Sequence, residues 1–166
     1  SSYMPISALM IDESVYRPIA EESGRIGTLG HGFTAGGHPV AAAVALENLA
    51  IIEERGLVAN AREVGAHLQK RLRDLSGHRL VGEVRGTGLI AAVELVTDEA
   101  AKTALDPVGK LGGVVAGIMQ EKGVISRAMG EAIAFCPPMI ITAAQVDDMV
   151  AVFAASLDEA VTRLGL

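Results

Sequence analysis

The glycine-rich run at residues 31–40 combines a hydroxyl side chain with a backbone suited to binding an anion. Gly32, Gly36 and Gly37 surround Thr34, and Pro39 opens an apolar segment typical of a helix. Glycine lets a backbone lie close to a ligand, and the free N–H groups at the start of a helix favour an anion. The Thr34 hydroxyl can donate a hydrogen bond to a phosphate. The run therefore indicates a phosphate site, while the same composition is also typical of an ordinary turn.

Few other side chains point to chemistry. We expect His31 and His38 to brace the glycine-rich loop, and Cys136 to be a packed thiol in an apolar strand. By residue type alone, Arg127 is typical of an arginine on a surface strand. The sequence contains neither a metal-ligand spacing nor a Ser-His-Asp arrangement, so we expect no metal site.

Composition limits the class of protein. The chain has 166 residues, of which 50% are apolar and 3% aromatic, so we expect a sizeable core of small aliphatic side chains. A net charge of −6 argues against nucleic acid as a partner. The sequence lacks both a membrane-spanning apolar run and a signal peptide, and its single cysteine fits a reducing compartment. We therefore expect a cytoplasmic protein with no membrane partner. The chain begins at Ser1 without Met, which indicates a piece of a longer protein.

The first third of the chain is expected to alternate between strand, helix and loop. The near-continuous apolar run at residues 3–11 is typical of a strand covered on both faces. Asp12 can cap a short helix that ends near residue 20, and a loop is expected over residues 23–37. A second helix is predicted over residues 39–55, ended by Gly56. A domain boundary is expected between Glu54 and Ala59.

The remainder predicts a compact α+β unit. A helix is expected over residues 61–75, and then two strands at residues 80–84 and 89–96, joined by a turn at residues 86–88. A helix at residues 107–122 precedes a hairpin of residues 124–127 and 132–136, which turns at residues 129–130. Thr142 and Gln145 form a capping box at the start of the last helix. An antiparallel sheet with helices on one face is the simplest packing. Two of these helices are expected to bury apolar stripes: Val108, Leu111, Val115 and Met119 in one, and Val146, Met149, Val150, Phe153 and Leu157 in the other.

Several segments, taken together, resemble a known family. They are Ser2-x-x-Pro5-Ile6-Ser7-Ala8, His31-Gly32-Phe33-Thr34, Gly37-His38-Pro39, Val84-Arg85-Gly86-x-Gly88-Leu89 and Pro137-Pro138-Met139-Ile140-Ile141-Thr142. In type and order they resemble the C-terminal third of class III aminotransferases, and most of all the ω-amino acid–pyruvate branch. These are pyridoxal phosphate (PLP)-dependent enzymes of fold type I. The resemblance implies an α/β fold in which residues 1–56 end the large PLP-binding domain, incomplete here, and residues 57–166 form the small C-terminal domain.

The resemblance also implies a role for several residues. Thr34, with Phe33 and Gly32, would bind the PLP phosphate of the neighbouring subunit, so that a homodimer has its active sites at the interface. Arg127 would bind the substrate carboxylate and swing aside for uncharged side chains; its planar fork suits a carboxylate. Arg85 is expected to form a structural ion pair. Ala35 and Gly36 depart from the family, which usually has Tyr-Ser or similar after the threonine, and remove possible side-chain contacts.

One catalytic part is missing from the sequence. In the family, the lysine that holds PLP as a Schiff base lies a few residues ahead of the Ser-x-x-Pro segment, and so upstream of Ser1. Lys70, Lys102, Lys110 and Lys122 stand in other contexts. We therefore expect no catalytic residue in this chain, which would be inactive alone. The intact protein is expected to be a transaminase. That enzyme would move an amino group from an ω-amino acid or amine to a keto acid such as pyruvate. Aminomutase or decarboxylase chemistry on the same scaffold, or a non-catalytic dimerisation module, remain alternatives.

Overall fold

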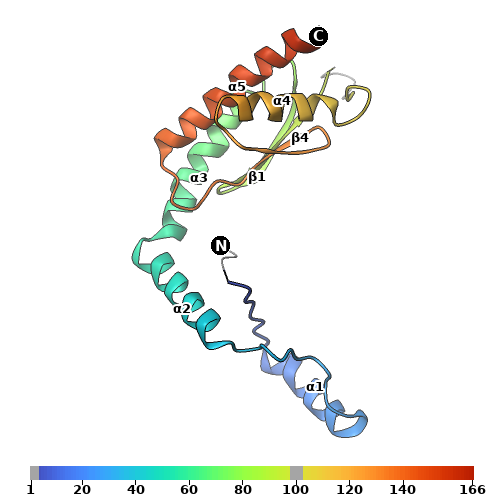
Figure 1. The fold of residues 1–166 in the computed structure, drawn as a ribbon, viewed down its shortest axis with the longest axis vertical. Helices are drawn as coiled ribbons and strands as arrows, with labels where there is room; N and C mark the ends of the chain where they lie inside the picture. The colour runs from blue at the N-terminus through green and yellow to red at the C-terminus, as the bar shows by residue number, and fades with distance from the viewer. Residues whose placement is uncertain (1–3, 98–102) are drawn as a thin grey trace. The chain divides into compact units, whose positions relative to one another are not determined.

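The fold divides into two units of contacts, Ser1–Arg55 and Gly56–Leu166, in a computed structural model that describes residues 4–97 and 103–166. Figure 1 shows the helices and strands of each unit. No helix in the described ranges is both long and apolar enough to cross a membrane.

The first unit contains two helices, α1 (Glu13–Ile26) and α2 (Pro39–Glu54). Asp12 caps α1, because its Oδ1 accepts a hydrogen bond of 2.9 Å from the Ser14 N–H. The helix runs past the predicted end near residue 20 and stops only at Gly27, whose φ of 107° few other residues adopt. The predicted loop was therefore wrong for residues 23–26 and is confirmed for residues 27–37. Helix α2 begins at Pro39 as predicted, where a missing N–H costs nothing.

The predicted strand at residues 3–11 is absent. Residues 5–12 have no regular secondary structure, and residue 3 lies outside the described residues. A strand needs a neighbour for its backbone hydrogen bonds, and the described part of the first unit contains no other strand. Its apolar side chains are correspondingly exposed, with Leu9 at 89% and Met10 at 94%.

The second unit is a four-stranded antiparallel sheet with three helices. The sheet has the order β1-β2-β4-β3, from β1 (Val81–Thr87), β2 (Ile90–Leu95), β3 (Arg127–Met129) and β4 (Ala132–Phe135). The helices are α3 (Leu57–Arg73), α4 (Lys110–Glu121) and α5 (Ala143–Leu164). Helix α3 packs on β1 and β2, α4 packs on β3 and β4, and α5 packs on both helices. This is the predicted α+β packing.

The two faces of the sheet differ in character. One row across the strands, Val84–Val93–Ile133–Ala128, belongs to the hydrophobic core, and the ring of Phe135 contacts that of Phe153 on α5 at 5.2 Å. Directly opposite residues share a face and neighbours along a strand alternate, so the next row, Arg85–Ala92–Ala134–Arg127, lies on the other face. The helices therefore cover one face of the sheet. The second face, called here the open face, carries mostly polar and small side chains, together with exposed Ile90 and Met129.

Turn positions differ from the sequence predictions by one to three residues. Strand β1 continues through Gly86 and Thr87, so the first hairpin turns at residues 88–89. The second hairpin turns at residues 130–131, which makes Arg127 the first residue of β3 and not the last of an earlier strand. Helix α4 starts at Lys110, and Val108, expected in its buried stripe, is exposed.

The apolar stripes predicted for the later helices are otherwise confirmed. Leu111, Val115 and Met119 are fully buried on α4. On α5, four of the five expected residues are buried and Met149 is half-buried. The capping box is present, with Thr142 Oγ1 accepting from the Gln145 N–H and Gln145 Oε1 accepting from the Thr142 N–H at 3.0 Å.

Candidate functional site

The glycine-rich loop of the first unit presents unused hydrogen-bond donors. Two turns shape it, with Gly36 N–H donating to the Phe33 carbonyl (2.9 Å) and His38 N–H donating to that of Ala35 (3.2 Å). Gly37 has a φ of 71°, a conformation that suits glycine. Thr34 is exposed, and among the described residues neither its hydroxyl nor its N–H has a hydrogen-bond partner. These donors stand in front of the start of α2, where backbone N–H groups favour an anion.

The aromatic residues of this loop brace it. The rings of His31 and Phe33 meet edge-to-face at 5.7 Å, in line with the bracing role expected of His31. His38 is the N-cap residue of α2, but its side chain makes no capping hydrogen bond. Gly32, Phe33 and Thr34 thus lie together in one exposed segment of the first unit.

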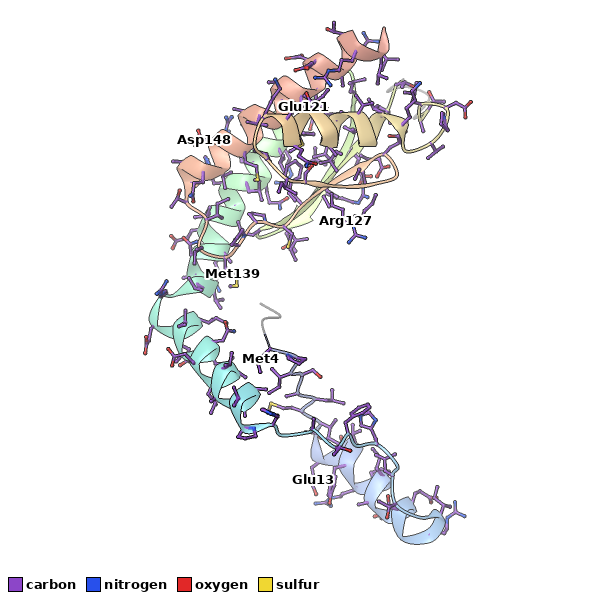
Figure 2. The ribbon with its side chains drawn as sticks, viewed as in Figure 1. Met4, Glu13, Glu121, Arg127, Met139 and Asp148 are labelled. Carbon is purple, nitrogen blue, oxygen red and sulfur yellow. The ribbon has the colours of Figure 1, made fainter. Side chains whose placement is uncertain are left out.

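Arg127 lies in the second unit, on the open face of the sheet. It is exposed at the start of β3, and Figure 2 shows its side chain pointing away from α4. Within the described residues its guanidinium has no ion-pair partner. An arginine without a carboxylate of its own can bind one supplied by a ligand through two parallel hydrogen bonds.

Arg85 stands in the same row of the open face, three strands away, and is paired. Its guanidinium lies 3.1 Å from Glu94 Oε2 and 3.5 Å from Glu83 Oε2, as expected of a structural ion pair. Ala92 and Ala134 separate the two arginines across the sheet. Of the two, Arg127 is therefore the one whose guanidinium has no ion-pair partner among residues 4–97 and 103–166.

Sequence reasoning missed the buried carboxylate that fixes the β3–β4 hairpin. Glu131 is only 4% exposed; its Oε1 accepts from the Gly109 N–H (2.8 Å) and its Oε2 from the Gly112 N–H (2.6 Å). A carboxylate that accepts from free N–H groups at a helix start acts as a cap supplied from outside the helix. Gly112 permits this approach, since a Cβ there would lie 2.3 Å from the Gly130 carbonyl oxygen. Glu131 thereby joins the hairpin that carries Arg127 to α4.

Polar side chains on α3 anchor two further segments. Asn60 Nδ2 donates to the carbonyls of Met139 (2.7 Å) and Ile141 (3.1 Å), so it holds the Pro-Pro-Met segment to the helix. Buried Gln69 donates to the carbonyls of Gly88 (3.0 Å) and Ile90 (3.1 Å) at the first hairpin. The sequence places both residues on an amphipathic helix, but it does not indicate these distant partners.

An ion pair also joins α3 to α5. Asp147 Oδ1 lies 2.7 Å from Arg71 Nε and 2.9 Å from His67 Nε2. These hydrogen bonds, that from Arg71 first, lower the pKa of Asp147 from its ordinary value.

The remaining candidate residues have ordinary surroundings. Lys70, Lys110 and Lys122 are exposed, and Lys102 lies outside the described residues. Lys70 pairs with Asp74 and Lys122 with Glu159, each at about 2.8–2.9 Å. The prediction of a packed thiol at Cys136 was wrong, because β4 ends one residue earlier and leaves the side chain exposed.

Comparison with known proteins defines the class of protein. A family model described as aminotransferase class-III matches residues 1–157. The chain belongs to the class III aminotransferases, whose α/β fold of type I accounts for the mixed helices and small antiparallel sheet. Enzymes of this class depend on PLP.

The similar proteins are transaminases. The chain is 41% identical over 91% of its length to a diaminobutyrate–2-oxoglutarate transaminase of Halomonas elongata, and 33% identical over 99% to gamma aminobutyrate transaminase 1 of Solanum lycopersicum. It spans about a third of the length of each (33% and 32%).

Solved structures agree in fold. A "transaminase with L-ala" is 66% identical with a TM-score of 0.94, over 98% of this chain and 38% of that one. The omega transaminase from Pseudomonas jessenii in complex with PMP is 51% identical with a TM-score of 0.92, over 99% of this chain and 36% of that one.

Proposed function

We propose that residues 1–166 belong to a PLP-dependent transaminase that moves an amino group from an ω-amino acid, amine or diamine to a keto acid such as pyruvate. The observation that carries this proposal is a pair of binding groups in a class III aminotransferase chain, the donors around Thr34 and the guanidinium of Arg127. Neither group has a partner within the part of the chain that the structure describes. The similar solved structures support it, since they include an omega transaminase with PMP and a transaminase with L-ala.

The glycine-rich loop fits the phosphate of the cofactor. A phosphate needs several N–H and O–H donors close together, and the exposed Thr34 hydroxyl, its N–H and the start of α2 supply them without displacing any internal hydrogen bond of the described residues. Gly32 leaves room at the backbone, where nothing lies within 4 Å of a Cβ added to it. The ring of Phe33 contacts that of His31 within the loop. In our proposal this phosphate belongs to PLP in the partner subunit of a homodimer.

Arg127 is proposed to hold the substrate carboxylate. Bidentate binding fixes the orientation of a planar carboxylate, and so positions the amino or keto carbon beside it. PLP, when bound, supplies an electron sink that carries the amino group between the two substrates. For an amine without a carboxylate, the exposed guanidinium can turn into solvent.

The domain assignment follows from the same proposal. We assign residues 1–56 to the end of the large PLP-binding domain and residues 57–166 to the small C-terminal domain. The lysine that bonds PLP is then supplied by sequence ahead of residue 1, and the chain by itself is inactive.

The test uses the complete polypeptide that carries these residues. With PLP, a primary amine and pyruvate, we expect formation of alanine and the matching carbonyl product. Arg127→Met should raise the KM for pyruvate by about tenfold or more, through loss of a charge-assisted pair. The KM for the amine should stay within about twofold.

Other outcomes would contradict the proposal. Carbon dioxide release, or an isomerised amino acid without a keto acid acceptor, would identify decarboxylase or aminomutase chemistry. A complete polypeptide that binds no PLP would indicate a non-catalytic module. An unchanged pyruvate KM in Arg127→Met would remove this arginine from the site while leaving the reaction intact.

A further inference from the structure

We propose that Arg85 is a positioning residue, which holds the carboxylate of Glu94 away from Arg127 and so keeps Arg127 available for the substrate carboxylate. This inference rests on the proposed function, because it takes Arg127 as the carboxylate-binding group. The observations that carry it are the strand register and the ion pairs of the open face.

The register brings an acid close to Arg127. Ala92 on β2 pairs with Ala134 on β4, which pairs with Arg127 on β3. Glu94 is two residues after Ala92 on β2, so it lies on the same face in the neighbouring row. Two strand spacings of ~4.8 Å and two residues of ~3.3 Å put the Cα atoms of Glu94 and Arg127 roughly 12 Å apart. Two long side chains pointing toward one another span most of that distance.

The side chains of β4 on the diagonal between the two groups are small, and Met129 on β3 flanks that diagonal in the row of Glu94. The strand β4 that separates them contributes Ala132 and Ala134 to these rows, and β2 contributes Ala92. Along the diagonal from Glu94 to Arg127, β4 therefore presents only the methyl groups of Ala132 and Ala134. A released Glu94 carboxylate would therefore be an internal competitor for the guanidinium.

Arg85 prevents this competition by geometry. It lies on the far side of Glu94 from Arg127, and its guanidinium binds Glu94 Oε2 at 3.1 Å and Glu83 Oε2 at 3.5 Å. The side chains of Arg85 and Glu94 are 47% and 38% exposed, so the pair is partly shielded from solvent. The acid is thereby held toward β1, and the arginine on β3 keeps no partner among the described residues.

The removal of Arg85 should therefore act on carboxylate binding alone. An exposed ion pair at the strong end of its usual range would occupy Arg127 roughly four-fifths of the time, and the apparent affinity for a ligand falls with the free fraction. In the complete PLP-loaded enzyme, we expect Arg85→Met to raise the KM for pyruvate about fivefold. The kcat and the KM for an amine without a carboxylate should stay within about twofold.

A second substitution separates this role from a merely structural one. In Arg85→Met/Glu94→Gln the competitor is gone, so the KM for pyruvate should return to within about twofold of the parent. Glu94→Gln alone should leave it unchanged, because the acid is already held. If Arg85→Met does not fold, Arg85→Gln and the single Glu94→Gln variant keep the test available.

The outcomes are distinguishable. An unchanged KM in Arg85→Met, no rescue by Glu94→Gln, or a large change in Glu94→Gln alone would each overturn the positioning role. If Arg127→Met itself leaves the KM for pyruvate unchanged, the proposed carboxylate site fails and this inference fails with it. A raised KM in Arg127→Met with an unaffected Arg85→Met overturns only the inference.

Discussion

The two units of this chain treat their apolar side chains in opposite ways. In the second unit, Phe153, Ile133 and their neighbours form one closed core in which many side chains are fully buried. In the described part of the first unit, Ala41 is the one buried apolar residue, while Leu9, Met10 and Phe33 are largely exposed. A sheet packed with three helices buries its own apolar side chains, whereas two helices and an irregular segment leave apolar surface that needs a partner. The difference indicates that the second unit is stable when it is alone and that the first unit is not.

The largest expected effect is on folding of the separated units. A chain of residues 56–166 should be a monomer that unfolds cooperatively, because it retains the whole closed core. Residues 1–55 alone should show no cooperative transition, and the chain of residues 1–166 should self-associate through its exposed apolar side chains. Circular dichroism melts and sedimentation check both points. A monodisperse monomer of residues 1–166 with an ordered first unit would contradict the comparison.

Matched isoleucines compare the units at single positions. Ile133→Ala should lower the free energy of unfolding by about 2–5 kcal/mol, since the side chain is 0% exposed and leaves a cavity. Ile26→Ala in the first unit should change it by no more than about 0.5 kcal/mol, because that side chain is 72% exposed. Urea denaturation measures both values. Equal losses would show that the first unit contributes a core of its own.

The sequence predicted the second unit well because its signals are local. Apolar periodicity identified α3, α4 and α5, and the Thr142–Gln145 pattern located the start of the last helix. The predicted strand at residues 3–11 was wrong, because an apolar run carries no information on whether a neighbouring strand is there to pair with it. The first unit therefore contained the largest error.

The candidate site was predictable in part. Thr34 and the glycines around it form a local motif that the sequence shows directly. The open-face row that contains Arg85 and Arg127 depends instead on the register of four strands. An error of one residue in a turn moves every side chain to the other face. Glu131, directly after Gly130, looks like a solvated turn residue. The available signal was Gly109, a helix start with no capping side chain of its own.

The buried carboxylate offers the next largest effect. Glu131→Gln places an amide NH₂ against a backbone N–H, so one donor at the start of α4 loses its acceptor. We expect a loss of about 1–3 kcal/mol in unfolding free energy. Glu22→Gln on α1 is the control and should change little, because this carboxylate is exposed and pairs with Arg25 alone among the residues that the structure describes. Chemical denaturation of both variants in the same background gives the comparison.

The smallest expected effect is on acid sensitivity. The pKa of Asp147 is lowered in the folded protein, chiefly by the hydrogen bond from Arg71, so the unfolded chain binds protons more readily. This pair therefore stabilises the fold above the ordinary pKa of 3.8, and its contribution is lost as the pH falls through the lower folded value. Asp147→Asn should flatten the fall in melting temperature below about pH 4. Asp148→Asn, an exposed neighbour, should keep the parent's slope; identical slopes in all three proteins would contradict this role for Asp147.

The binding of PLP by the complete polypeptide tests the functional account most directly. Thr34→Ala removes one hydroxyl donor from the exposed loop, and Thr28→Ala removes a threonine hydroxyl from the same loop outside the glycine-rich run. We expect the Kd for PLP, followed by its absorbance, to rise about tenfold or more in Thr34→Ala. In Thr28→Ala it should stay within about twofold of the parent. Equal affinities in all three proteins would contradict the assignment of this loop to the cofactor phosphate.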